Sequence, residues 1–232
     1  MSNVIVLDTE TSDLDPSKGG ALLELAWIKL QTTEDGGWEI VASASNYIEY
    51  SGVISPHAQA VHHIKADQLT AISGAVPKTE AIQKLLSFHD QDTIFVAHNM
   101  DFDSKFLQEI PGPWICTLKC SRHLWPDAPG HSNQVLRYWL NIEPTAQIQG
   151  LYPHQALYDV ATTTALLLKM LVSQTLVNLV NLTRSPVKLK RMNFGKHRGL
   201  EFNQIPTDYL RWLRGQPNLD PDLKHTLDSM LK

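Results

Sequence analysis

The segment Asn3-Val-Ile-Val-Leu-Asp-Thr-Glu10 has the pattern of a buried strand that ends on two acids. Side chains alternate along a strand, so Asp8 and Glu10 leave the same face, about 7 Å apart. Because α/β sheets place ligand crevices at the carboxyl ends of their strands, we expect a site here. Two carboxylates at this spacing can share hard divalent cations, although an Asp-Thr-Glu tripeptide also occurs at ordinary strand ends.

The order of the expected elements indicates an α/β domain. Four more strands are expected at residues 21–30, 38–48, 93–97 and 114–117, and helices at residues 77–89, 102–110, 133–140 and 156–172. The short turn Glu34-Asp-Gly-Gly37 joins the second and third strands, which are therefore expected to be antiparallel. Three meandering strands, followed by strands that alternate with helices, predict a mixed five-stranded sheet flanked by helices.

The charge of the chain is uneven. The net charge is −4, from 20 basic and 24 acidic residues; residues 184–232 carry 10 basic and 5 acidic side chains, which leaves 10 and 19 for residues 1–183. We expect a main domain over residues 1–183 and a small basic C-terminal module over residues 184–232. A basic segment on an acidic body can hold a polyanion, although a basic run is often only a solvated face.

The composition excludes several classes of protein. With 43% apolar residues the chain has enough material for a sizeable core, which excludes global disorder. No apolar run approaches the roughly 18 residues of a membrane span, and we see no secretory signal. Cys116 and Cys120 are expected to be buried thiols, because two cysteines build no disulfide scaffold and have no zinc-ligand spacing. We therefore expect a cytoplasmic enzyme that needs no membrane.

A second group of acids follows the strand that is expected to end at Ala97. In His98-Asn-Met-Asp-Phe-Asp103, both Asp101 and Asp103 qualify as metal ligands. Asn99 or Asp101 would equally suit the cap of the helix that follows. The residues alone leave these alternatives open.

The third group is His154-Gln-Ala-Leu-Tyr-Asp159. Five residues of a regular helix turn through about 140°, so His154 and Asp159 cannot share one helix face. The conflict disappears if His154 lies in the entering loop and Asp159 in the first turn. A histidine that solvent can reach suits a general base better than a rigid ligand, because imidazole exchanges protons near neutral pH. A plain surface histidine is the alternative.

Together the three groups resemble the DnaQ-like (DEDDh) 3′→5′ exonucleases. A strand-borne Asp-x-Glu, an Asn-x-x-Phe-Asp that opens a helix, and a His-x4-Asp that opens a later helix occur in the family's order. The resemblance extends over nearly the whole chain and implies the ribonuclease H-like fold. It departs from the family pattern in the loop after Glu10, which is expanded by Asp15-Pro-Ser-Lys-Gly-Gly20.

The resemblance also implies a mechanism. Asp8, Glu10, Asp103 and Asp159 would bind two Mg²⁺ ions, with Mn²⁺ able to substitute, and Asp101 would not be a ligand. Two divalent ions can neutralise the charge that develops on a phosphodiester as it is cleaved. His154 would take the proton from the attacking water. The substrate would be a DNA 3′ end, single-stranded or duplex, and the products nucleoside 5′-monophosphates.

The resemblance also implies substrate contacts around these groups, at Thr9, Thr11, Leu14, His62, His98 and Asn99. Leu14 would pack on the base of the terminal nucleotide, whereas His98 and Asn99 would orient the site. A loop hydroxyl, a core leucine and a plain loop histidine are the alternative interpretations of Thr11, Leu14 and His62.

The tail has its own pattern. Phe194-Gly-Lys-His-Arg-Gly199 places glycines around potential cations, so that the backbone can approach a phosphate. Tyr209, Trp212 and Leu213 have the spacing of one helix face, and we expect them to be core residues. We predict that this module grips nucleic acid outside the active site.

Several alternatives remain at this stage. An RNA-trimming 3′→5′ exoribonuclease would use the same carboxylates, because they do not read the 2′ position of the sugar. A proofreading subunit of a polymerase is a further variant. A catalytically silent nucleic-acid-binding module is the alternative from another class, and a homodimer is also open.

Overall fold

The computed structural model describes residues 2–144 and 148–231. Its centre is a five-stranded sheet in the order β3-β2-β1-β4-β5. The strands are β1 Asn3–Thr11, β2 Leu22–Thr32, β3 Trp38–Tyr47, β4 Ile94–Ala97 and β5 Trp114–Cys116. The first three strands are antiparallel to one another, whereas β4 and β5 run parallel to β1. The predicted mixed five-stranded sheet is thus confirmed.

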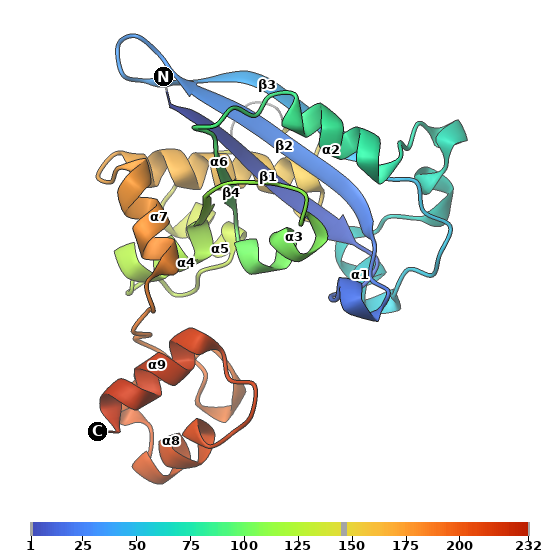
Figure 1. Ribbon diagram of the computed structural model, residues 1–232. Helices are drawn as coiled ribbons and strands as arrows, with labels where there is room; N and C mark the ends of the chain where they lie inside the picture. Colours follow the sequence, from blue (N-terminus) through green and yellow to red (C-terminus); the bar gives the residue numbers. More distant parts are fainter. Residues whose placement is uncertain (1, 145–147, 232) are drawn as a thin grey trace.

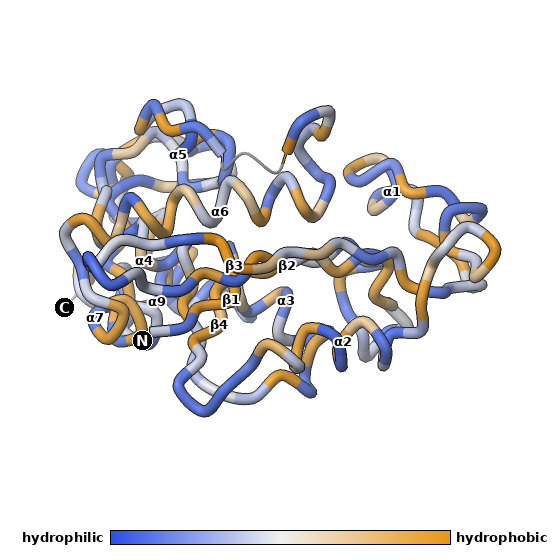
Figure 2. Tube along the Cα trace, turned by 90° about the horizontal axis from the view of Figure 1, so that it is seen from above, coloured by the Kyte–Doolittle hydropathy of each residue, from blue (hydrophilic) through white to orange (hydrophobic). Residues whose placement is uncertain are grey.

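The central strand β1 is buried on both faces (Figure 2). Val4 and Val6 belong to one apolar cluster, and Ile5 and Leu7 to another. Since side chains alternate along a strand, the acids at positions 8 and 10 continue the valine face, and Thr9 continues the other. The alternation of side chains along β1 therefore determines which helices can contact Asp8 and Glu10 and which can contact Thr9.

Helices cover both faces of the sheet (Figures 1 and 2). On the Ile5 face lie α2 Lys78–Leu86 and α3 Met100–Phe106. On the valine face lie α4 Thr117–Leu124, α6 Ala156–Leu171 and α7 Leu176–Arg184, with α5 Asn133–Trp139 packed on α6. Among the α-helices described up to Arg184, the last to be placed is α1 Pro56–His62, near the carboxyl end of β1.

The helix expected at residues 102–110 is shifted to Met100–Phe106. Asn99 has a left-handed backbone conformation, with φ of 69°, and turns the chain directly from β4 into the helix. Helix α3 therefore starts two residues earlier than the apolar pattern indicates, which leaves Asp103 in its first turn.

Within the described residues no single helix is long and apolar enough to cross a membrane. Taken together, α6 and α7 are long and apolar enough to span a membrane by length and composition alone, but the pair is bent by 108°.

The chain after α7, from residue 185 to residue 231, forms the C-terminal segment, which lies apart from the sheet in Figure 1. It has an apolar core of its own. It contains α8 Thr207–Arg214 and α9 Pro221–Met230. The buried apolar residues of this core are Met192, Phe202, Ile205, Leu210, Leu213, Leu223 and Leu227. Leu213 is buried as expected, but the core position expected for Trp212 is wrong, because its side chain is 57% exposed. Helix α8 packs through Leu210 and Leu213, one turn apart, which turns Trp212 toward solvent.

Asp222 of α9 ties this segment to α4. Its side chain is buried, with one carboxylate oxygen 3.1 Å from Nη1 of Arg122 and the other 3.7 Å from Nζ of Lys119. The backbone N–H of Val187 donates to Oδ1 of Asp222 at 2.9 Å. An exposed ion pair between Lys190 and Asp127 adds a second connection. The segment is therefore fixed against the helix that follows β5.

Asp222→Ala is expected to lower the free energy of unfolding by about 2–4 kcal/mol, because two cations lose the carboxylate that neutralises them. Urea unfolding measures the change. Asp228→Ala is the matched control on the same helix, since Asp228 pairs with Arg214 at the surface, and it should cost less than about 1 kcal/mol. Equal losses in the two variants would contradict the anchoring role of Asp222.

Candidate active site

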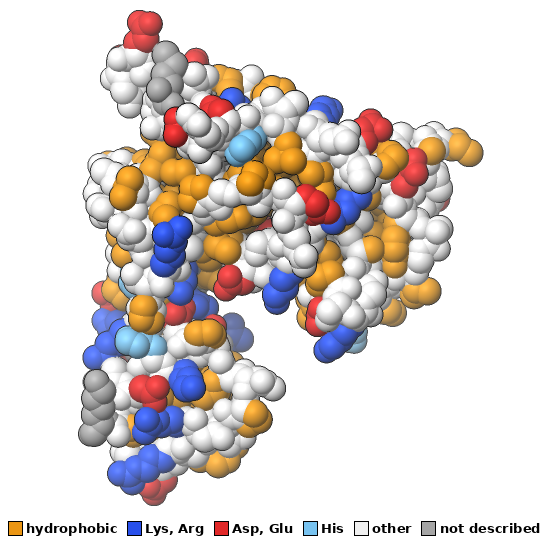
Figure 3. Space-filling view, in the orientation of Figure 1, with side chains coloured by type: hydrophobic (Ala, Val, Ile, Leu, Met, Phe, Trp, Pro, Cys, Tyr) orange, Lys and Arg blue, Asp and Glu red, His pale blue; other side chains and the backbone are white. Residues whose placement is uncertain are grey.

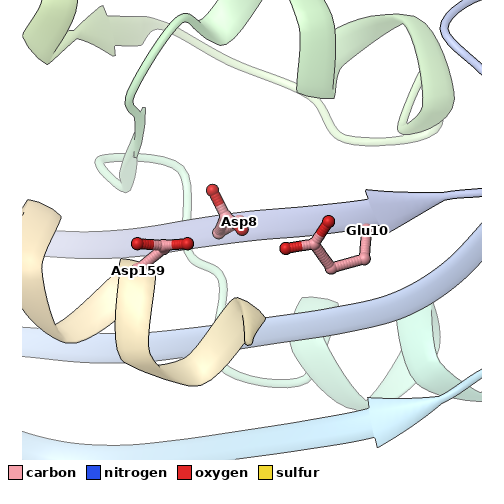
Figure 4. Close-up of side chains that lie close together, drawn as sticks. All are labelled: Asp8, Glu10 and Asp159. Carbon is pink, nitrogen blue, oxygen red and sulfur yellow. The ribbon is translucent and has the colours of Figure 1, made fainter. Parts of the chain in front are cut away.

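Three carboxylates converge at the carboxyl end of β1. Asp8 and Glu10 come from the strand and Asp159 from the first turn of α6, and oxygens of the three lie within 4.8 Å of one another. Figure 4 shows the three side chains pointing toward one another. The two acids of β1 lie on the valine face, which α6 covers, so the alternation of the strand explains why Asp159 meets them.

Burial and mutual repulsion raise the pKa values of these three carboxylates. Burial raises the pKa of Asp8 well above its ordinary value, and the charges of Asp103 and Asp159 raise it further. Burial, followed by the charge of Glu24, raises the pKa of Glu10 to about 9. Burial also raises the pKa of Asp159. The neighbours that act on Asp8 and Glu10 are all acidic, so the group is electrostatically incomplete without cations.

Asp103 approaches from the opposite face of the sheet. It lies on α3, is 2% exposed, and accepts a hydrogen bond of 2.8 Å from Oγ1 of Thr9. Burial raises its pKa to about 7. Asp103 is not one of the three acids within 4.8 Å, yet its charge is the strongest acidic influence on Asp8. Asp101 is exposed and lines a different cavity.

His154 lies in the turn before α6 and is exposed. Its φ of 68° is in the left-handed region, and its backbone N–H donates to Oδ2 of Asp159 at 2.9 Å. The backbone of His154 is thus held by an acid of the site, while its imidazole is open to solvent.

Glu24 is an acid of the site that the sequence analysis missed. It pairs with Glu10 in the register of β1 and β2 and is 6% exposed. Ser45 donates to its Oε1 at 2.7 Å, and the backbone N–H of Ala156 donates to Oε2 at 3.3 Å. Glu24 therefore caps the first turn of α6, close to Asp159. Glu24 is the only acid in an otherwise apolar stretch of β2, which could have marked it in the sequence. Its position opposite Glu10, however, follows only from the register of the two strands.

A cavity of about 540 Å³ opens beside Glu10, which lies within the range of ligand pockets. Its lining includes Thr11, Leu14 and His62, and also Phe102, which the sequence analysis used only as part of the family motif. Leu14 is 74% exposed, which argues against the alternative of a core leucine. The position of Phe102 directly before Asp103 was the signal that could have identified it.

His62 is held in one tautomer. The backbone N–H of Ile64 donates to Nδ1 at 2.9 Å, so Nε2 carries the proton and donates to the carbonyl of Thr11 at 3.2 Å. Burial lowers the pKa of His62 and favours this neutral form. His62 therefore fixes the end of β1 against α1, at the wall of the cavity.

His98 uses both ring nitrogens inside the protein. Nδ1 lies 2.9 Å from Oγ1 of Thr117 and Nε2 lies 2.8 Å from the carbonyl oxygen of His131. Burial lowers its pKa to about 4, so the ring is neutral. This geometry favours the orienting role over a direct substrate contact. Asn99 is exposed at the start of α3, and its side chain makes no capping hydrogen bond there.

The acids fit divalent cations of the magnesium type. All donors are carboxylate oxygens, which suit Mg²⁺ and Mn²⁺ better than Zn²⁺. The raised pKa values of Asp8, Glu10 and Asp159 show that the protein holds these groups where a negative charge is costly unless a cation is near.

Comparison with known proteins agrees with this geometry. The family model "RNase_T: Exonuclease" matches residues 5–167. The chain is 32% identical over 235 residues to "Exodeoxyribonuclease 10" of Escherichia coli (strain K12), with 98% of each chain covered. It is 28% identical over 177 residues to "DNA polymerase III PolC-type" of Bacillus subtilis (strain 168), which covers 72% of this chain and 11% of that protein.

A solved structure agrees as well. "Exonuclease X in complex with 5' overhanging duplex DNA" is 32% identical, with a TM-score of 0.61, and the match covers 78% of this chain and 99% of that one. The ribonuclease H-like fold is thereby confirmed. The family match and the identity to a relative of nearly equal length show that the chain is a phosphodiester hydrolase that belongs to the RNase T/DnaQ-like family of exonucleases.

Proposed function

We propose that the chain is a metal-dependent 3′→5′ exodeoxyribonuclease that releases nucleoside 5′-monophosphates from DNA 3′ ends. The observation that carries the proposal is the convergence of Asp8, Glu10 and Asp159 within 4.8 Å, beside a cavity of about 540 Å³. DNA as the substrate is supported by the name of a 32% identical relative, an exodeoxyribonuclease, and by a solved structure, also 32% identical, that contains duplex DNA.

The acids would hold two Mg²⁺ ions, and Mn²⁺ would substitute. Asp8, Glu10 and Asp159 would bind the first, and Asp103 with Asp8 the second. When bound, such ions stabilise the negative charge that develops on the phosphate and lower the pKa of water. The protein supplies buried carboxylates, with Asp103 oriented by Thr9 and the start of α6 held by Glu24.

His154 would be the general base. Its backbone N–H donates to Asp159, and its side chain is exposed to solvent. A neutral imidazole there can accept the proton of the attacking water and pass it to solvent.

The cavity would receive the terminal nucleotide. Leu14 and Phe102 offer apolar surface to its base, and Thr11 lies beside Glu10 at the wall. The neighbouring residues would have supporting roles. Thr9 would orient Asp103, His62 would position the wall of the cavity, and His98 and Asn99 would position the chain between β4 and α3.

The test is digestion of one oligonucleotide that carries a label at the 5′ end in one sample and at the 3′ end in another, with Mg²⁺. We expect a ladder that shortens from the 3′ end and a labelled 5′-monophosphate released at once from the 3′-labelled strand. Cleavage from the 5′ end or inside the strand would contradict the proposal. Faster digestion of a matched RNA would make the enzyme an exoribonuclease.

Asp103→Asn is expected to lower kcat/KM on DNA by about a thousandfold at saturating Mg²⁺, because the side chain loses the charge that balances a cation. Asp101→Asn, two residues away on the same helix, is the matched control and should retain activity within about threefold. Equal losses in the two variants would show that the choice of ligand is wrong.

A further inference from the structure

The loop 193–200 of the C-terminal segment is shaped by two glycines. Gly195 and Gly199 have φ of 64° and 87°, in the region that favours glycine. Two backbone hydrogen bonds close the loop: Gly199 N–H donates to the Met192 carbonyl at 2.8 Å, and Met192 N–H donates to the Leu200 carbonyl at 2.9 Å. The loop therefore presents Lys196 and Arg198 on a fixed backbone.

This loop packs on aromatic residues of α8. Nζ of Lys196 lies 5.0 Å from the centre of the Tyr209 ring, and the ring of His197 meets the same ring edge-on at 4.5 Å. Tyr209 in turn lies 5.4 Å from Trp212, between ring centres. Lys196, Tyr209 and Trp212 thus lie in one row of contacts, and Phe194 and Arg198 belong to the same loop as Lys196. We call these five residues the loop patch: Phe194, Lys196, Arg198, Tyr209 and Trp212.

Several aromatic and cationic groups of the loop patch are exposed to solvent. Phe194 is 41% exposed and Trp212 is 57% exposed. Lys196 and Arg198 form no ion pair with a carboxylate of residues 2–144 or 148–231, whereas Arg191, Arg211 and Arg214 each do. Figure 3 shows lysine and arginine side chains distributed over the drawn face of this segment.

Exposed aromatic rings beside unpaired cations are the combination that binds single-stranded nucleic acid. Bases stack on the rings, and the cations hold the phosphates. An acidic protein surface would use the cations but would leave the rings without a matching partner. The combination therefore favours a nucleic acid strand as the occupant.

The segment that carries the loop patch is held by ion pairs to α4 of the main sheet region. Asp222 fixes its segment to Lys119 and Arg122 of α4. Lys119 also lines a cavity of about 280 Å³ together with Arg184 of α7 and Asp101 of α3, the helix that carries Asp103. Cations thus continue from the surface beside α3 to the contact with the C-terminal segment.

We infer that the loop patch is a second nucleic-acid-binding surface, which holds the single strand leading away from the active site. The inference rests on the proposed function for the identity of the polymer as DNA. The surface would add affinity for long strands and would take no part in cleavage, because none of its residues belongs to the acid cluster.

The test compares two double variants. Lys196→Gln with Arg198→Gln removes the two unpaired cations of the patch. Arg214→Gln with Lys224→Gln removes the same charge from the same segment, at α8 and α9, and is the control. Binding of a 30-nucleotide DNA strand is measured in EDTA by fluorescence anisotropy at several salt concentrations, and hydrolysis of the p-nitrophenyl ester of thymidine 5′-monophosphate is measured with Mg²⁺.

For the patch variant we expect affinity for the strand to fall about tenfold or more, and the slope of log affinity against log salt to decrease by about 1.4, since two phosphate contacts are lost. Ester hydrolysis should be unchanged, because this substrate reaches only the active site. Trp212→Ala should weaken binding about tenfold without changing the salt slope, since stacking releases no counterions. The control should stay within twofold.

An unchanged affinity and salt slope in the patch variant would overturn the inference. Equal losses in the patch variant and the control would also overturn it, since total charge would then explain the binding. If the native protein hydrolyses neither the ester nor the strand, the proposed function fails, while the binding data in EDTA still decide the role of the loop patch.

Discussion

Asp8→Asn is expected to reduce Mg²⁺-dependent cleavage of DNA 3′ ends by at least about a thousandfold and to stabilise the metal-free protein. Asp8 is the acid on which Asp103, Asp159, Glu10 and Glu24 all act, and asparagine keeps its size without its charge. The same substitution therefore removes the cation ligand and relieves the repulsion.

The direction of the stability change follows from the raised pKa of Asp8. The native metal-free protein retains a proton where the unfolded chain has released it. Stability is then greatest below the ordinary pKa of aspartate, near 4, and is lost as the pH rises. Asparagine does not titrate, so the variant does not lose stability in this way. The difference in stability between the variant and the native protein should therefore grow between pH 5 and pH 8.

Thermal unfolding in EDTA at pH 5 and pH 8 measures this effect. At pH 8 the variant should melt about 4 °C higher than the native protein, which corresponds to about 1–2 kcal/mol for a chain of this size. Added Mg²⁺ should raise the melting temperature of the native protein but not that of the variant. Asp67→Asn, at an exposed acid, is the control and should change neither property. A variant that is less stable than the native protein at pH 8 would contradict the argument.

The second large effect is expected at His154. His154→Ala should lower kcat by about 10² to 10⁴, because the attacking water loses its proton acceptor. The affinity for Mn²⁺ should stay within about threefold, since the contact to Asp159 comes from the backbone N–H, which alanine retains.

The left-handed conformation of His154 calls for a second variant. Alanine is strained at φ of 68°, whereas asparagine tolerates this region and lacks an imidazole. His154→Asn should therefore match the loss of kcat while keeping the loop geometry. Calorimetric titration with Mn²⁺ and rates at saturating metal give the two quantities. An affinity for Mn²⁺ that falls as steeply as the rate would show that His154 is a metal ligand instead of a base.

The sheet was predictable because its strands are apolar runs bounded by turn residues. The strand ends agree with the expected ranges to within two residues, from β2 Leu22–Thr32 to β5 Trp114–Cys116. Helices α1, α4, α7 and α9 were not predicted. The first is only 7 residues long, and α4 follows β5 without a break, so its start carries no loop signal.

The side chains of the site were predictable to different degrees. The common face of Asp8 and Glu10 follows from the period of a strand alone. The preference for Asp103 over Asp101 needed the family resemblance, because both acids lie in the first turn of α3. The role of Glu24 depends on the register of β1 and β2. The exposure of Trp212 depends on which face of α8 packs against the core. Local sequence determines neither of them.

The central claim is that acids far apart in the sequence form one site for divalent cations. The most direct measurement is anomalous diffraction from a crystal of the protein soaked with Mn²⁺. We predict one peak among the carboxylates of Asp8, Glu10 and Asp159, and a second between Asp8 and Asp103. Density without a peak among these acids, at a Mn²⁺ concentration that supports cleavage, would contradict the account.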